Sequence, residues 1–190
     1  MKFVAISFDT SILNDLRHYS NLSELYTVNP QDFLKQSKSD KSKYYINLVT
    51  QDFELRKKIS QHLSFLNYNR FSVVHEGSCV TASTVGDGSF IYPNVTLYPD
   101  SIIGQDVIVH SNSRISHNSV IGDGCFIGGL VNISGSVKIG KYNRIYPCCN
   151  IIDKICICDN VVIGTGSTIK KSIHESGTYS KLSDKIKKII

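Results

Sequence analysis

The sequence of 190 residues has no tryptophan, one methionine and four prolines. It also has no apolar run near the ~20 residues that a membrane-spanning helix needs, and it shows no signal-peptide architecture. Charged residues make up 19% and hydrophobic residues 41%, as in ordinary soluble proteins. These absences predict a cytoplasmic protein without a membrane span.

Signals for nucleic acid and for metal are also weak. The net charge of +5 suits a small anionic ligand, and lysines cluster only in the C-terminal tail, so we expect no nucleic-acid partner. The six cysteines lack zinc-finger spacing and have no histidine nearby, so we expect no metal. Instead, Cys79, Cys125 and Cys149 are expected to be small, reduced core residues.

The dominant feature that is present is a six-residue apolar repeat between Val73 and Ile169. The residue four places after each repeat position is mostly small or aliphatic, so each hexad would point one large and one small side chain inward. A helix or a simple alternating strand does not give this period, which is typical of a parallel β-helix. The repeat positions are Val73, Cys79, Val85, Ile91, Leu97, Ile103, Val109, Ile115, Ile121, Ile127, Ile133, Ile139, Ile145, Ile151, Ile157, Ile163 and Ile169.

A second period indicates how the hexads group into coils. Gly86, Gly104, Gly122 and Gly140 are spaced by three hexads. The spacing predicts a triangular prism with three hexads per coil, in which these glycines stack along one corner. We expect glycine there because it permits the backbone geometry that a tight corner needs.

The part of the chain before Phe71 lacks this repeat. Strands are predicted at 2–7, 24–28 and 44–50, and helices at 11–18, 31–36 and 51–66, so the region resembles a small parallel α/β unit. We therefore divide the chain into an α/β domain (1–70), a β-helix (71–172) and a C-terminal tail (173–190). The lysine-rich tail is interpreted as an amphipathic cap over the last coil, with phosphate contact as the alternative.

Ligands of parallel α/β units bind beyond the carboxyl ends of the strands. The turn after the first predicted strand contains Asp9 but no glycine, so the phosphate-binding fingerprint is absent. Asp9 could accept hydrogen bonds from a sugar hydroxyl, or it could simply cap the following helix.

His117 is the strongest candidate for chemistry within the repeat. It lies two places after Ile115, where the chain turns and side chains point outward, and imidazole titrates near ~6.5. Asn118 and Asp123 are polar neighbours that could fix its tautomer. A solvated surface histidine is the simpler alternative, and a metal shared between subunits by His75, His110 and His117 is a further one.

The segment His75–Ile169 resembles the hexapeptide-repeat acyltransferases, whose repeat forms a left-handed β-helix. The match is closest to nucleotide-sugar N-acetyltransferases and sialic acid O-acetyltransferase-like proteins, which carry a small α/β domain before the helix. Residues 109–122 (VHSNSRISHNSVIG) are similar to the segment that holds the family's general base. Residues 133–140 (ISGSVKIG) and 162–167 (VIGTGS) are similar to segments along which acetyl-CoA lies.

The resemblance implies an acetyl-CoA-dependent acetyltransferase that acts on an amino or hydroxyl group of a nucleotide-linked sugar in surface polysaccharide biosynthesis. It implies a homotrimer without a metal, with His117 as general base and Asn118 in place of the usual acid. It also implies contacts to acetyl-CoA, and these fall on Gly135, Gly164, Thr165 and Gly166.

The sequence departs from the family at several points. Phe126 stands where some members have a second histidine, and the glycine-rich turn after the first strand is missing. Two alternatives therefore stay open: an acyltransferase for a non-sugar acceptor such as serine, or a β-helix with a binding or structural role and no activity.

Overall fold

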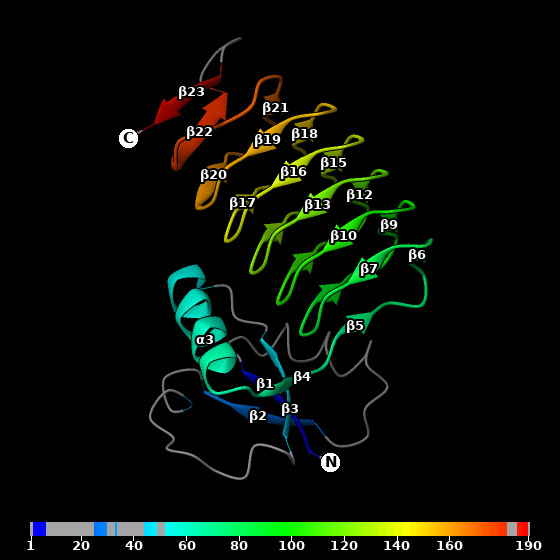
Figure 1. The fold of residues 1–190 in the computed structure, drawn as a ribbon, viewed down its shortest axis with the longest axis vertical. Coiled ribbons are helices and arrows are strands. Elements are labelled where there is room, and N and C mark those ends of the chain that lie inside the picture. Colours follow the sequence, from blue (N-terminus) through cyan, green and yellow to red (C-terminus); the bar gives the residue numbers. More distant parts are fainter. Residues whose placement is uncertain are drawn as a thin grey trace.

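The computed structural model describes residues 2–6, 25–29, 33, 44–48, 52–181 and 186–189 (Figure 1). Most of this chain is a solenoid in which every coil contributes one short strand to each of three parallel sheets. The five-stranded sheet contains β7 (Thr84–Val85), β10 (Ile102–Ile103), β13 (Val120–Ile121), β16 (Lys138–Ile139) and β19 (Cys156–Ile157). The six-stranded sheet contains β6 (Cys79–Val80), β9 (Thr96–Leu97), β12 (Arg114–Ile115), β15 (Asn132–Ile133), β18 (Asn150–Ile151) and β21 (Thr168–Ile169).

The third sheet has eight strands and ends in an antiparallel pair. It contains β5 (Val73–Val74), β8 (Phe90–Ile91), β11 (Ile108–Val109), β14 (Phe126–Ile127), β17 (Arg144–Ile145), β20 (Val161–Ile163), β22 (Gly177–Lys181) and β23 (Ile186–Ile189). The chain passes from the six-stranded to the five-stranded to the eight-stranded sheet. We therefore name the turns the six–five, five–eight and eight–six corners.

The predicted hexad frame describes the interior correctly from Ile91 to Ile169. Every frame residue in that range is buried, and together they form the main core cluster. Strands pair with strands three hexads further along the chain, as in Ile103↔Ile121, so one coil consists of three hexads. The prediction of a mostly β protein with a parallel β-helix after a small parallel sheet is confirmed.

The frame is wrong in the first coil. Val74, not Val73, pairs with Ile91, and Val80, not Cys79, pairs with Leu97. The hexad that starts at Val80 is one residue short, because the next inward residue is Val85. Cys79 therefore points outward and is exposed, so its interpretation as a core residue is wrong, whereas Cys125 and Cys149 are buried as expected.

The small inward residues do more than fill space, because their side chains connect successive coils. The hydroxyl of Ser119 donates to the carbonyl of Ser134 (2.9 Å) and accepts from the Val137 N–H (3.2 Å). The same pair of bonds recurs at the same phase of other hexads, at Ser89, Ser113 and Cys125. These bonds satisfy polar groups that would otherwise be buried without a partner.

Each corner contains one residue in the left-handed region of the backbone. These residues recur at every sixth position, and most of the early ones are Asn, Asp or Gly, which tolerate a positive φ. From the second coil onward they are Gly88, Asn94, Asp100, Asp106, Asn112, Asn118, Gly124, Leu130, Ser136, Tyr142, Cys148, Lys154, Asn160 and Gly166.

The predicted column of stacked glycines exists, but glycine is required there for a different reason from the one expected. None of its four glycines has a positive φ. A Cβ atom on Gly122 would lie 2.6 Å from the carbonyl carbon of Gly140, and one on Gly86 would lie 2.5 Å from that of Gly104. Glycine is needed there because successive coils approach closely.

The N-terminal unit has a four-stranded parallel sheet in the order β2-β1-β3-β4, formed by β1 (Lys2–Ile6), β2 (Leu25–Val28), β3 (Tyr44–Leu48) and β4 (Asn69–Arg70). The helix α3 (Phe53–Phe65) follows β3, close to its predicted position. Asp52 caps it by accepting from the Leu55 N–H at 3.1 Å. The predicted helices at 11–18 and 31–36 lie outside the described residues, apart from Phe33 in the second.

A buried polar cluster joins this unit to the solenoid. Arg70 forms an ion pair with Asp106 (3.0 Å), and Ser60 donates to the same carboxylate (2.6 Å). Arg56 donates to the backbone carbonyls of Asp106 and Gly124. Removal of Asp106 would leave the buried Arg70 guanidinium without its counter-ion, so the cluster stabilises the packing of α3 against the five–eight corner.

The C-terminal tail extends the eight-stranded sheet. β22 pairs in parallel with β20, and β23 closes the sheet by antiparallel pairing with β22. Tyr179 packs against the main core. No helix in the described part of the chain is long and apolar enough to cross a membrane.

Candidate active site

His117 lies at the six–five corner, in the turn between β12 and β13, and its side chain is exposed. The hexad explains this position, because Ile115 and Ser119 on either side point inward and are buried. The bonds of Ser119 to the next coil anchor the turn. The imidazole is thus held at the surface by a rigid backbone.

Asn118 has two roles in this turn. Its φ of 56° makes it one of the positive-φ corner residues, for which asparagine is well suited. Its side chain also reaches back to the histidine: Nδ2 of Asn118 lies 3.1 Å from Nδ1 of His117. The residue that shapes the corner therefore also contacts the imidazole.

Gly135 lies one coil further on, at the same corner. A Cβ atom there would lie 2.6 Å from Nε2 of His117, so the imidazole rests against the bare backbone of Gly135. The Ser136 N–H donates to the carbonyl of His117 at 2.9 Å, which fixes the separation of the two turns. The structure thus brings His117, Asn118 and Gly135 together.

The other residues that the sequence assigns to acetyl-CoA lie elsewhere on the prism. Gly164, Thr165 and Gly166 occupy the eight–six corner between β20 and β21. Gly164 is covered by β22, since its Cβ position lies 2.7 Å from Oγ of Ser180. Gly166 has a positive φ of 70° and no atom within 4 Å of its Cβ position, so its backbone is accessible. One chain does not bring these residues next to Gly135.

The interpretation of Asp123 as a partner of His117 is wrong. Asp123 lies at the five–eight corner, where it pairs with Lys141 (2.8 Å) and accepts from the Gln105 N–H (3.0 Å). Burial opposes its ionisation, yet the hydrogen bonds from Lys141 and Gln105 hold the pKa of Asp123 below its ordinary value.

The other two histidines of the possible shared metal site have separate surroundings. The ring of His110 stacks on Tyr92, with centroids 4.4 Å apart, and meets Phe126 edge-on. His75 accepts from the Gly77 N–H at 2.9 Å. Across the described ranges, no three His, Cys, Asp or Glu side chains are grouped so that they could hold a metal ion. Asp9 lies outside the described residues.

Comparison with known proteins agrees with this architecture. Residues 82–117 and 118–153 match the family model described as bacterial transferase hexapeptide (six repeats). Both matched segments lie within the solenoid. The match to a transferase family agrees with the acyltransferase activity that the sequence implies. No curated protein sequence matches the chain.

Three solved structures share the fold over nearly the whole chain. The acetyltransferase domain of PglB from Neisseria gonorrhoeae FA1090 has a TM-score of 0.83 and 16% identity, with 100% of each chain covered. PerB from Caulobacter crescentus, solved with CoA and GDP-perosamine, has a TM-score of 0.82 and 16% identity, and 98% of this chain and 97% of PerB are covered. WeeI from Acinetobacter baumannii AYE has a TM-score of 0.52 and 13% identity, with 100% of each chain covered.

Proposed function

We propose that this protein transfers the acetyl group of acetyl-CoA to an amino or hydroxyl group of a nucleotide-linked sugar in surface polysaccharide biosynthesis. The observation that carries the proposal is the exposed His117, held between Asn118 and Gly135 at a corner of a hexapeptide solenoid. Two relatives support the choice of substrates: the PglB domain was solved with acetyl-CoA, and PerB with CoA and GDP-perosamine.

In the proposed reaction, His117 acts as general base. The acceptor nitrogen attacks the carbonyl carbon of the thioester, and Nε2 of His117 takes a proton from that nitrogen. The tetrahedral intermediate then collapses, the C–S bond breaks, and the CoA sulfur takes the proton from the imidazolium. The products are the acetylated sugar and CoA, and general base catalysis of this kind contributes ~10²–10⁴-fold.

This role requires one tautomer of the imidazole. With the Asn118 amide N–H directed at Nδ1, a neutral imidazole carries its proton on Nε2 and cannot accept another there. A half-turn of the amide presents its carbonyl to Nδ1–H instead and leaves the Nε2 lone pair free. We infer that the base-competent form has the Asn118 carbonyl facing His117.

We further propose that the active unit is a homotrimer. Gly135 and Gly166 lie at different corners of one prism, so a second chain must supply the eight–six corner if acetyl-CoA contacts both. An exposed histidine also needs a second wall to enclose a ligand. Light scattering at micromolar concentration tests this, and a monomer would contradict it.

The deciding experiment measures thiol release from acetyl-CoA with a panel of amino-sugar nucleotides and with serine. We expect turnover with a sugar nucleotide, and we expect His117→Ala to lower it ~10²–10⁴-fold with little change in acetyl-CoA affinity. The exposed His174 provides the matched control, since His174→Ala should keep wild-type rates. Turnover with serine alone would favour the non-sugar alternative, and no turnover with any acceptor would favour a binding solenoid.

A further inference from the structure

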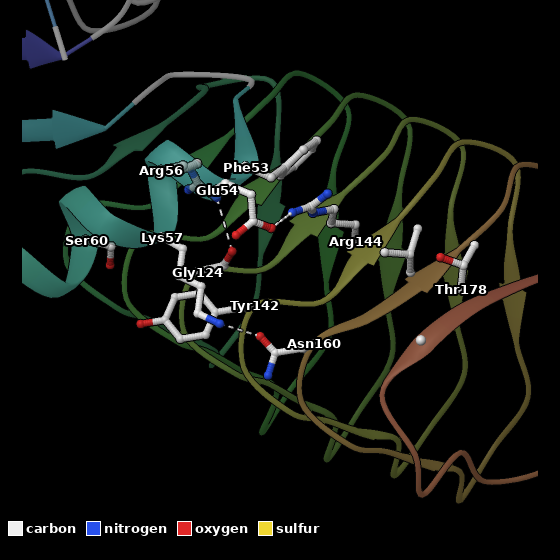
Figure 2. Close-up of a pocket in the computed structure, with 12 residues that line it drawn as sticks. Phe53, Glu54, Arg56, Lys57, Ser60, Gly124, Tyr142, Arg144, Asn160 and Thr178 are labelled. Atoms are coloured by element: carbon white, nitrogen blue, oxygen red, sulfur yellow. Dashed lines mark hydrogen bonds and ion pairs between the residues drawn. The ribbon is translucent and has the colours of Figure 1, made fainter. Parts of the chain in front are cut away.

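A second candidate site lies between α3 and the five–eight corner, away from the six–five corner that holds His117. Here the first turns of the helix and the part of the solenoid between Gly124 and Thr178 line a cleft of about 220 Å³ (Figure 2). The helix contributes Phe53, Glu54 and Lys57, and the solenoid contributes Tyr142, Arg144 and Asn160. The proposed acyl transfer uses none of these residues.

Two cationic side chains in the cleft, Arg144 and Lys57, lack a buried carboxylate partner among the described residues. Arg144 pairs with Glu54 at 2.7 Å, but the Glu54 side chain is 77% exposed. An exposed pair of this kind contributes little, so another anion can displace it. Nζ of Lys57 donates to the amide oxygen of Asn160 at 2.6 Å, and no carboxylate pairs with Lys57 in the part of the chain that the structure describes.

The floor of the cleft adds positive charge. Arg56 lines it and is buried, and its guanidinium donates to the backbone carbonyls of Asp106 and Gly124, while the Asp106 carboxylate pairs with Arg70. Nε of Arg56 has no hydrogen-bond partner among the described atoms. Burial lowers the pKa of Arg56, and Asp106 opposes this effect. An anion in the cleft would therefore stabilise a guanidinium that is costly to bury.

Aromatic rings position both cations. The guanidinium of Arg144 lies over Phe53, 4.3 Å from the ring centroid, and Nζ of Lys57 lies over Tyr142 at 5.0 Å. These contacts limit the side-chain rotamers, so less entropy is lost when a ligand binds. Figure 2 shows both side chains in the cleft, with Arg144 directed toward Glu54 and Lys57 toward Asn160.

We propose that this cleft binds the phosphate group of a small phosphorylated molecule. Arg144 would contact the phosphate through its guanidinium, as arginine does in bidentate phosphate recognition, and Lys57 would add a second charge. Glu54 would leave Arg144 as the phosphate enters. Glu54 therefore competes with the ligand. Removal of its charge should tighten phosphate binding, whereas removal of either cation should weaken it.

The experiment is calorimetric titration of the full chain, without acetyl-CoA or acceptor, with pyrophosphate as the main probe. Inorganic phosphate and ribose 5-phosphate form the other two arms and separate a free anion from a phosphorylated molecule as the preferred ligand. Lys57→Gln and Arg144→Gln should each weaken pyrophosphate binding about tenfold or more. Glu54→Gln should tighten it about twofold to fivefold, because the competing carboxylate is lost.

The exposed Lys138 on β16 serves as the matched control, and Lys138→Gln should bind pyrophosphate like the wild type. Thermal melts check that each variant is folded, and if Arg144→Gln is not, Lys57→Gln and Glu54→Gln decide. The proposal is overturned if the wild type binds none of the three probes at millimolar concentration, if Glu54→Gln does not tighten binding, or if Lys138→Gln weakens it as much as Lys57→Gln.

Discussion

Nε2 of His117 lies 2.6 Å from the place where a Cβ atom on Gly135 would be. Since real Cβ atoms essentially never come so close to another atom, Gly135 must be glycine for the imidazole to keep this position. The glycine expected to contact acetyl-CoA is therefore also a support for the proposed base.

This contact predicts that a side chain at Gly135 lowers turnover but hardly changes the stability of the protein. Gly135→Ala should push the imidazole aside and lower turnover by about 10²-fold, since misplacement of ~1 Å can cost that much. The unfolding free energy should change little, because the atoms that must move belong to a surface side chain. Gly122→Ala provides the contrast, since its Cβ atom would meet backbone of the next coil. We expect that variant to lose about 1–3 kcal/mol. Equal melting temperatures for the two variants would contradict the assignment.

Variants of Asn118 separate its backbone role from its contact with His117. Asn118→Gly tolerates the positive φ but lacks the amide, so we expect a normal melting temperature and a turnover lowered about tenfold. Asn118→Asp can only accept from Nδ1–H and adds a negative charge that stabilises the imidazolium. Its pH–rate profile should therefore have an acid limb shifted to higher pH. Wild-type turnover in Asn118→Gly would remove the amide from the mechanism.

A buried asparagine predicts a large effect on stability. Asn143 is 1% exposed, and its amide donates to the carbonyls of Gly140 and Cys158 and accepts from the Val161 N–H. Asn143→Leu would leave the Cys158 carbonyl and the Val161 N–H without these partners, at about 1–3 kcal/mol each, whereas the Gly140 carbonyl also accepts from the Cys125 thiol. Urea denaturation should thus show a loss of at least ~2 kcal/mol. The control is the exposed Asn150, where leucine should change stability by less than ~0.5 kcal/mol.

A buried thiol predicts a loss of stability in alkali. Burial raises the pKa of Cys125 from 9.0 to about 12. In the unfolded chain the thiol ionises near pH 9 while the native thiol stays protonated, so its contribution to stability is full below pH 9 and is lost as the pH rises toward 12. The slope is at most ~1.4 kcal/mol per pH unit. Cys125→Ser cannot ionise there, and serine makes the same two bonds at Ser119. Unfolding curves from pH 8 to 11 should therefore diverge, and parallel curves would contradict the prediction.

The sequence predicts the interior well because a narrow core accepts few residue types. The hexad positions from Ile91 to Ile169 follow one frame without exception. The frame fails at Cys79, in the first coil. This coil has a neighbouring coil on one side only, so a shortened hexad there loses little packing. The apolar hexad alone does not predict the positive-φ positions, although Asn, Asp and Gly recur at many of them with the same six-residue spacing. This second pattern identifies Asn118 as a corner residue independently of any chemical role.

The part of the candidate site that is set by the length of one coil can be predicted from the sequence. Gly135 follows His117 by three hexads, which is one coil, so their proximity follows from the repeat itself. The cleft beside α3 was not predictable, because Glu54 and Arg144 are far apart in the sequence and meet only through the docking of the helix. The cluster around Asp106 likewise depends on that docking.

The shortened hexad between Val80 and Val85 has a consequence for the evolution of chain length. No coil precedes the first one, so a deletion of one residue there disturbs no pairing with an earlier coil. Between Ile91 and Ile169 the same deletion would move every later aliphatic side chain off the interior and every later left-handed residue off its corner. Viable insertions and deletions there should come in steps of a whole coil, which keeps side chains above their equivalents. Homologous genes that encode longer or shorter solenoids are thus expected to differ by whole multiples of the codons for three hexads, and not by single codons or single hexads.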